Sequence, residues 1–399
     1  MKKIITLFIL ISLLIITVPS LFSDDMWMRL YDRINTLEYR YSVLQSMMDT
    51  DDPGTIPVFQ KALDDTNRTT LTNLTSEDKR FYDEIQKISI KKLGDFKVKE
   101  AEDAIFQAYS NTGNLVIKTE SIEALGKMGS DKFIEEFIIT LRNINMRIDS
   151  NANISDNESM AYALVNYFEK IRNEKAYEVV FYAAVGWYSP RSEIKENAKN
   201  SLKVISNDPS VIIKSILEKD PDFDNKYIAL TAEKDSYASD EKKSNTATAG
   251  LKEGLRHKVS TIPENMKLLN LRLLACKMLI NSSYKDPAAV PYLEQILYDN
   301  FDVSEKLTVI ETLGTFKSNE SVATLIKYLK DQNNKQADGM SPYIDRRTVI
   351  ATINALGESG NPAAREELIV TTTIQTWSAA VLQSARTALD KLNKAKLQK

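Results

Sequence analysis

Residues 121–141 read SIEALGKMGSDKFIEEFIITL, and this stretch decides the fold. An apolar helical segment ends in Ala124-Leu125-Gly126, a short polar break follows, and a second apolar segment runs over 133–141. The stretch that starts at Ser89, SIKKLGDFKVKEAEDAIFQAY, has the same layout 32 residues earlier. A pair of helices this short cannot bury all its apolar surface alone, so the repetition predicts a stack of helix pairs.

The same layout returns in the C-terminal third of the chain. Leu313-Gly314 and Leu356-Gly357 each end an apolar helical segment and precede a polar break and a further apolar segment. Glycine adopts left-handed dihedral angles cheaply, so each of these glycines is predicted to stop its helix. Breaks such as Asp286-Pro287 and Asn361-Pro362 are predicted to start the next helix, because Asp and Asn cap helices and Pro suits the first turn.

These segments resemble HEAT repeats of the bacterial, phycobilisome-lyase-related kind, over roughly residues 30–395. The resemblance is strongest over 89–141 and 268–392. It implies an all-α fold: an α-solenoid, or superhelix, of stacked antiparallel helix pairs, HEAT/armadillo-like. Tetratricopeptide repeats have a similar period, but their Gly-Tyr pair and terminal Pro do not recur in this sequence.

The first 23 residues have the order of a secretory signal peptide. Lys2 and Lys3 precede an apolar run over 4–18, and small residues follow. The run is short for a membrane span, which needs about 20 residues. Cleavage after Ser20 or after Ser23 is expected, and an uncleaved N-terminal anchor is the alternative. The protein is therefore expected to be exported and periplasmic or envelope-associated.

Polar stretches suggest how the array is divided. We predict an N-terminal array over 24–230, a polar and partly helical junction over 231–265, and a C-terminal array over 266–399. Two further polar stretches, 143–159 and 330–342, are predicted to be loops inserted between helices.

Composition narrows the possible functions. The formal net charge is −3, which gives no electrostatic case for nucleic-acid binding. Only 12 Gly and 11 Pro occur in 399 residues, which favours long helices. The chain has one histidine, His257, and one cysteine, Cys276. A zinc site of the usual Cys/His type needs four such ligands, so the sequence excludes one. No nucleotide-binding glycine loop is present.

One acidic run has the spacing of a calcium-binding loop. Asp220, Asp222 and Asp224 stand at positions one, three and five of such a loop. Position twelve of such a loop is normally a glutamate that binds calcium through both carboxylate oxygens. In this chain position twelve is Thr231, which cannot supply those two oxygens. A turn between two helices is the other interpretation, and it is preferred.

Aromatic residues cluster at Phe181, Tyr182, Trp187 and Tyr188. Aromatic side chains at helical spacing usually belong to the core. The alternative is a partner-binding surface on the concave face of the solenoid.

The functional expectation is a non-enzymatic protein-binding or scaffold protein of the bacterial cell envelope, acting through the concave surface of the solenoid. Its partners are expected to be proteins rather than nucleic acid, with membrane contact only through an uncleaved signal segment. No catalytic residue and no cofactor is predicted. One alternative is an enzyme or enzyme-accessory protein of the envelope, and another is an N-terminally anchored structural protein.

Overall fold

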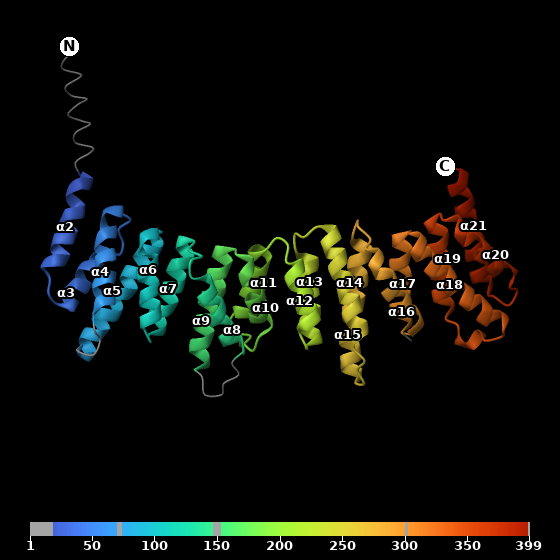
Figure 1. Ribbon diagram of the computed structural model, residues 1–399, viewed down its shortest axis with the longest axis horizontal. Coiled ribbons are helices and arrows are strands. Elements are labelled where there is room, and N and C mark those ends of the chain that lie inside the picture. The colour runs from blue at the N-terminus through green and yellow to red at the C-terminus, as the bar shows by residue number, and fades with distance from the viewer. Residues whose placement is uncertain (1–18, 70–73, 147–152, 300–301, 398–399) are drawn as a thin grey trace, which may run out of the picture. The chain divides into compact units, whose positions relative to one another are not determined.

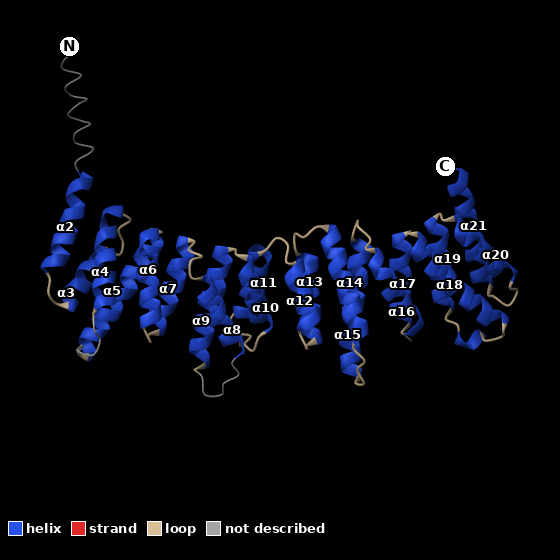
Figure 2. Cartoon of the chain, in the orientation of Figure 1, coloured by secondary structure: helices blue, strands red, loops and turns tan. Residues whose placement is uncertain are grey.

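The computed structural model describes residues 19–69, 74–146, 153–299 and 302–397 (Figure 1). Within these ranges it contains 20 α-helices and no strand (Figure 2). Successive helices pack on one another along the chain, so the predicted all-α solenoid is confirmed. Two compact units make up the chain: unit 1, Met1–Ser206, and unit 2, Asn207–Lys399.

Unit 1 contains ten described helices, which follow one another as pairs. Its helices are α2 (Pro19–Arg33), α3 (Leu37–Ser46), α4 (Ile56–Arg68), α5 (Ser76–Asp95), α6 (Glu102–Asn111), α7 (Leu115–Met128), α8 (Ile134–Met146), α9 (Ile154–Ile171), α10 (Tyr177–Val185) and α11 (Ile194–Ile205). The odd-numbered helices from α3 to α11 pack side by side as one row, and the even-numbered helices lie on the other side of that row.

Unit 2 repeats this arrangement with five helix pairs. Its helices are α12 (Ser210–Lys219), α13 (Phe223–Asp235), α14 (Asp240–Arg256), α15 (Ile262–Asn281), α16 (Val290–Asp299), α17 (Val303–Phe316), α18 (Asn319–Ala337), α19 (Arg346–Ser359), α20 (Arg365–Thr373) and α21 (Ala379–Leu397). The odd-numbered helices again pack in sequence, from α13 to α21.

The glycines of the Leu-Gly motif do not stop their helices, and this prediction was wrong. Gly94, Gly126, Gly314 and Gly357 all lie inside the last turn or two of an odd-numbered helix. Each faces the next odd-numbered helix at close range. A Cβ at Gly94 would lie 2.6 Å from Cβ of Ala124, and one at Gly357 would lie 2.7 Å from Cβ of Ala388.

The motif therefore encodes helix packing. Gly94 and Gly314 each meet the Ala that stands two positions before the Gly of the following repeat, Ala124 and Ala355, whereas Gly126 packs on Tyr167 of α9. Gly and Ala let two helix backbones approach closely along the row. Termination comes a few residues later, from left-handed residues that include Gly129 with φ 67°.

Substituting Ala at Gly94 tests this packing role. Overpacking typically costs about 1–3 kcal/mol, whereas removing a helical Gly gains only about 1 kcal/mol. We expect Gly94→Ala to lower the stability of unit 1, measured by urea denaturation followed by circular dichroism. Gly113→Ala is the matched control, because a Cβ there meets nothing within 4 Å. Equal midpoints for the two variants would contradict the packing role.

The Asp/Asn-Pro corners start helices as predicted. Asp286 accepts a hydrogen bond from the backbone N–H of Ala288 at 3.0 Å, and Asn361 accepts one from Ala363 at 3.0 Å. In both cases Pro occupies the first turn of a short 3₁₀ helix, which leads directly into α16 or α20. The side chain satisfies a backbone donor that the helix start would otherwise leave unpaired.

The division between the units falls after Ser206, ahead of the polar stretch 231–265. Most of that stretch is helical, including all of α14. The polar residues of α14 are largely core residues: Ser244, Thr246 and Glu253 are at most 4% exposed. The helix predicted within the junction is therefore present, and its polar side chains are largely buried.

The predicted insertion over 330–342 is also mainly helical, since α18 continues to Ala337. Asn333 on this extension is 1% exposed. Its Nδ2 donates to Glu367 on α20 at 2.6 Å, and its Oδ1 accepts from Trp377 Nε1 at 3.0 Å. These bonds tie α18 to α20 and to the segment before α21. The other predicted insertion, 143–159, is shorter than expected, because α9 already begins at Ile154.

Two buried ion pairs connect neighbouring helices of unit 2. Lys226 Nζ on α13 lies 2.9 Å from Glu253 Oε2 on α14, and both side chains are at most 5% exposed. Burial alone would raise the pKa of Glu253, but the hydrogen bond and the positive charge of Lys226, together with hydrogen bonds from His257 and Arg256, outweigh burial and lower that pKa. Arg272 on α15 holds Glu305 on α17 through two hydrogen bonds, of 2.6 and 3.1 Å.

The predicted signal peptide lies mostly outside the described residues, which begin at Pro19 in α2. In the part of the chain that the structure describes, no helix combines the length and the apolar character needed to span a membrane.

Candidate functional site

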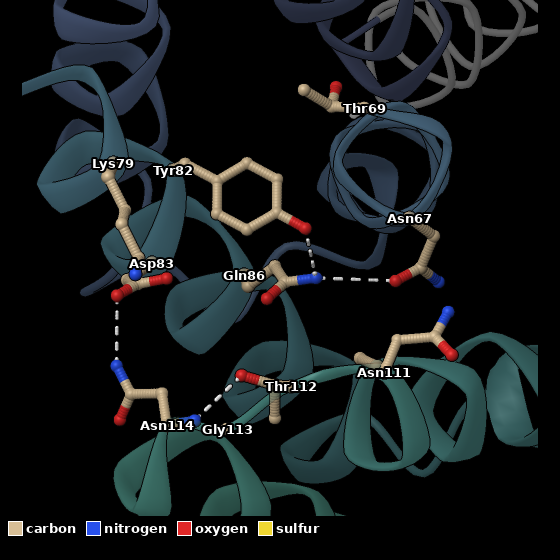
Figure 3. A pocket seen from close by; sticks show the side chains of 11 residues that line it. Asn67, Thr69, Lys79, Tyr82, Asp83, Gln86, Asn111, Thr112, Gly113 and Asn114 are labelled. Carbon is tan, nitrogen blue, oxygen red and sulfur yellow. Dashed lines mark hydrogen bonds between the residues drawn. The ribbon is translucent and has the colours of Figure 1, made fainter. Parts of the chain in front are cut away.

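A polar pocket of about 370 Å³ opens in unit 1 between α4, α5, α6 and the turn that leads into α7 (Figure 3). We call it the α4–α6 pocket. One wall comes from a single face of α5, where Lys79, Tyr82, Asp83 and Gln86 follow one another at helical spacing. Thr75 caps this helix through the backbone N–H of Asp78, which sets where the polar face begins.

The opposite wall of the pocket comes from the end of α6 and the turn after it. Asn111, Thr112 and Asn114 lie there. Asn114 caps α7 by accepting from the backbone N–H of Val116 at 3.0 Å. Its amide nitrogen donates to Asp83 Oδ2 at 2.9 Å across the pocket (Figure 3). This bond fixes the turn against α5.

A chain of hydrogen bonds sets the orientation of the Gln86 amide. Tyr82 donates its hydroxyl proton to the carbonyl oxygen of Thr66 at 3.0 Å, and burial raises the pKa of this phenol. Asn67 donates from Nδ2 to the carbonyl oxygen of Ala104 at 2.9 Å. The Tyr82 and Asn67 oxygens are therefore left as acceptors, and Gln86 Nε2 donates to them at 3.1 and 3.3 Å.

This arrangement leaves Gln86 Oε1 unsatisfied. Gln86 is 2% exposed, and its Oε1 is buried with no hydrogen-bond partner among the residues that the structure describes. Figure 3 shows the oxygen on the side of the amide away from Tyr82 and Asn67. Leaving a buried acceptor unpaired typically costs about 1–3 kcal/mol. Buried polar groups without partners are rare in native proteins, so this one calls for an explanation.

A second pocket, of about 380 Å³, lies between α7 and α9 on the row of odd-numbered helices. We call it the α7–α9 pocket. Two carboxylates line it, Glu123 and Glu158, together with hydroxyl-bearing side chains that include Tyr162. Burial and the neighbouring Glu123 raise the pKa of Glu120, one turn before Glu123 on α7. The carboxylate and hydroxyl oxygens that line the pocket can accept hydrogen bonds, so the pocket suits a ligand group with several N–H donors.

The predicted aromatic cluster is divided between core and surface. Phe181 and Tyr188 are 0% and 1% exposed, so they serve the core. Tyr188 donates to Asn145 Oδ1 at 2.5 Å, and Trp187 Nε1 donates to the carbonyl oxygen of Ile144 at 3.0 Å. Tyr182 and Trp187 are half-buried. Partner binding through these two residues stays a prediction.

The acidic run of unit 2 forms a turn between α12 and α13. Asp220 accepts from the backbone N–H of Asp222 at 2.8 Å, and Asp222 accepts from that of Asp224 at 2.8 Å. Asp224 also pairs with Lys267 at 2.5 Å. The three carboxylates therefore cap backbone and balance charge, as the preferred interpretation expects. Among the described residues no three His, Cys, Asp or Glu side chains converge in a way that could hold a metal ion.

The single His and the single Cys, His257 and Cys276, both pack against other parts of the fold. His257 Nε2 lies 3.4 Å from Glu253 Oε2, and its ring lies 5.3 Å from that of Phe223. Cys276 is fully buried, and this burial raises the pKa of its thiol to about 12. A thiol with such a pKa is a poor nucleophile at neutral pH.

Neither pocket was identified in the sequence. The α4–α6 pocket draws its polar residues from three helices and a turn, and no motif links them. The one local signal is the polar run 111–114, Asn-Thr-Gly-Asn, which follows an apolar helix. A turn of this composition is typical of many loops and has no specificity by itself.

Comparison with known proteins adds no assignment. No family model matches the chain, and no curated protein is significantly similar to it.

Proposed function

We propose that this chain is an exported, non-enzymatic binding protein of the bacterial cell envelope, built from HEAT-like repeats, which holds a protein partner on the odd-numbered helices of unit 1. The observation that carries the proposal is the α7–α9 pocket. It is a concave, acceptor-rich site on a row of helices that presents consecutive side chains to one side. Repeat proteins commonly bind partners through such extended surfaces.

The chemistry of this pocket favours a basic segment of the partner. Glu123 and Glu158 line it, and the raised pKa of Glu120 reflects burial and carboxylate crowding that a cation would relieve. Tyr162 also lines the pocket and is 37% exposed, and Val116, one turn before Glu120 on α7, is 50% exposed. A Lys or Arg flanked by an apolar side chain suits this combination.

Photo-cross-linking in intact bacterial cells tests the proposal. A benzophenone amino acid at position 162 should form a discrete adduct with a partner protein, recovered in the envelope fraction. The same probe at position 139 is the matched control, because Ile139 on α8 is 48% exposed but belongs to the even-numbered helices. Introducing Glu123→Lys into the chain that carries the probe at 162 should reduce the adduct about tenfold, which corresponds to about 1.4 kcal/mol of binding free energy.

Two results would overturn the proposed binding site, and a third would contradict export. One is an equal adduct pattern at positions 162 and 139, which would place no partner on the odd-numbered helices. The other is an adduct at 162 that the charge reversal leaves unchanged, which would remove the role of the acidic pocket. Adducts confined to the cytosolic fraction would contradict export.

A further inference from the structure

The α4–α6 pocket supports an inference that does not depend on the protein partner. We propose that it is a binding site for a small, uncharged compound rich in hydroxyl groups, such as a monosaccharide or a cyclic polyol. The unsatisfied Gln86 Oε1 is the acceptor that a ligand hydroxyl would complete.

The orientation of the Gln86 amide is fixed by its hydrogen bonds, so its unpaired oxygen is a fixed feature of the pocket. Gln86 lines the pocket, and its amide cannot turn over without breaking two bonds. A flip would point Oε1 at Asn67 Oδ1, which is held as an acceptor because Asn67 Nδ2 is committed to Ala104. The unpaired oxygen is therefore a consequence of the fold and not of an arbitrary amide orientation.

The lining favours hydroxyl groups over ionic ligands. Lys79 and Asp83 contribute one charge of each sign, so the pocket does not select a net charge. Asn111 and Asn114 add amide groups that both donate and accept, and hydroxyl groups also do both. Oε1 is covered from solvent, so a ligand hydroxyl reaches it only after a small movement of the side chains that line the pocket. An ammonium group would lose its hydration there, and burying a charge is costly unless it is paired.

The volume sets the size of the ligand. At about 370 Å³ the pocket lies near the lower end of the usual range for small-molecule sites, about 300–1,000 Å³. A single sugar ring fits this range, whereas a long oligosaccharide would have to extend beyond the lining residues.

Calorimetric titration of the full-length protein tests the proposal. The probes are D-glucose, D-galactose, N-acetyl-D-glucosamine and myo-inositol, with glycine and L-alanine as zwitterions of similar polarity. We expect saturable binding of at least one of the four hydroxylated probes and none of the zwitterions. The variant Gln86→Met removes the acceptor and keeps the length and burial of the side chain. It should weaken binding at least tenfold.

If Gln86→Met folds poorly, a second variant at the rim of the pocket still tests ligand binding. Asn111 is exposed at the rim, so Asn111→Ala should leave the fold intact and still weaken binding several-fold. Glu84→Gln is the matched control, because Glu84 is the α5 residue next to Asp83 and does not line the pocket. Unchanged binding in both pocket variants, no saturable binding of any hydroxylated probe, or tighter binding of a zwitterion would overturn the proposal. None of these outcomes bears on the cross-linking at position 162.

Discussion

Replacing Glu305 with Ala should destabilise unit 2 by about 3–5 kcal/mol, the cost typical of breaking a buried ion pair from one side. Glu305 is fully buried, and the side chain of Arg272 is 12% exposed. The substitution leaves the guanidinium between α15 and α17 without its carboxylate, in a place where water cannot replace it. We expect a lower midpoint in urea denaturation of the full-length chain.

The geometry of the pair explains the size of this effect. Arg272 Nε and Nη2 donate to the two oxygens of Glu305 at 2.6 and 3.1 Å, and Nη1 donates to the carbonyl oxygen of Gly254 at 2.8 Å. Arg272 thus connects α14, α15 and α17. A bidentate Arg–carboxylate pair of this kind is among the stronger side-chain hydrogen-bond arrangements.

Two controls separate the lost pair from other causes. The double variant Arg272→Met with Glu305→Leu removes both charges and should cost less than Glu305→Ala alone, because no unpaired charge is left. Glu358→Ala breaks an exposed pair with Lys391 and should have a much smaller effect. If Glu305→Ala and Glu358→Ala shift the midpoint equally, burial of the Arg272 pair has no energetic role.

Replacing Leu125 with Ala should cost about 2–5 kcal/mol, as expected for a buried large-to-small change. Leu125 on α7 is 0% exposed, and α7 packs against α5 on one side and α9 on the other. In a stack of repeats each helix pair depends mainly on its neighbours, so the loss should be local. Hydrogen exchange measured by mass spectrometry should show faster exchange in α5, α7 and α9.

Unit 2 is the internal reference for this experiment. The helices that pack on α7, which carries Leu125, are α5, α6 and α9, and all of them belong to unit 1. We therefore expect unchanged exchange in α15, α17 and α19. A uniform acceleration over both units would show that the chain unfolds as one cooperative body and would contradict repeat-by-repeat stability.

The helix pairs and their corners were predictable because they depend on neighbouring residues. An apolar stripe at helical spacing, an Asp or Asn cap and a following Pro act within one or two turns. The glycine of the Leu-Gly motif was misinterpreted for the opposite reason. Its role depends on Ala124 or Ala388 in another repeat, about 30 residues away, and a local rule for helix ends does not include that contact.

The polar residues of helix α14 also depend on partners that are distant in the sequence. Its polar residues led to the prediction of a polar, partly helical junction over 231–265, yet Thr246 and Glu253 are buried. Lys226 pairs with Glu253, and Arg272 donates to the carbonyl oxygen of Gly254, so partners on two other helices make burial possible. Polar side chains are buried when the fold supplies their hydrogen bonds, and composition cannot show whether it does.

The amino-acid sequence by itself determined that this chain is all-helical, that its helices come in repeated pairs, and where many of them begin. These properties follow from periodicity and capping, which are local. Only the tertiary structure decided which glycines serve packing, which charges are buried in pairs, and that Gln86 faces a pocket with an unsatisfied oxygen. Each of these depends on atoms brought together from different helices, because hydrogen bonding and close packing act through space and not along the chain.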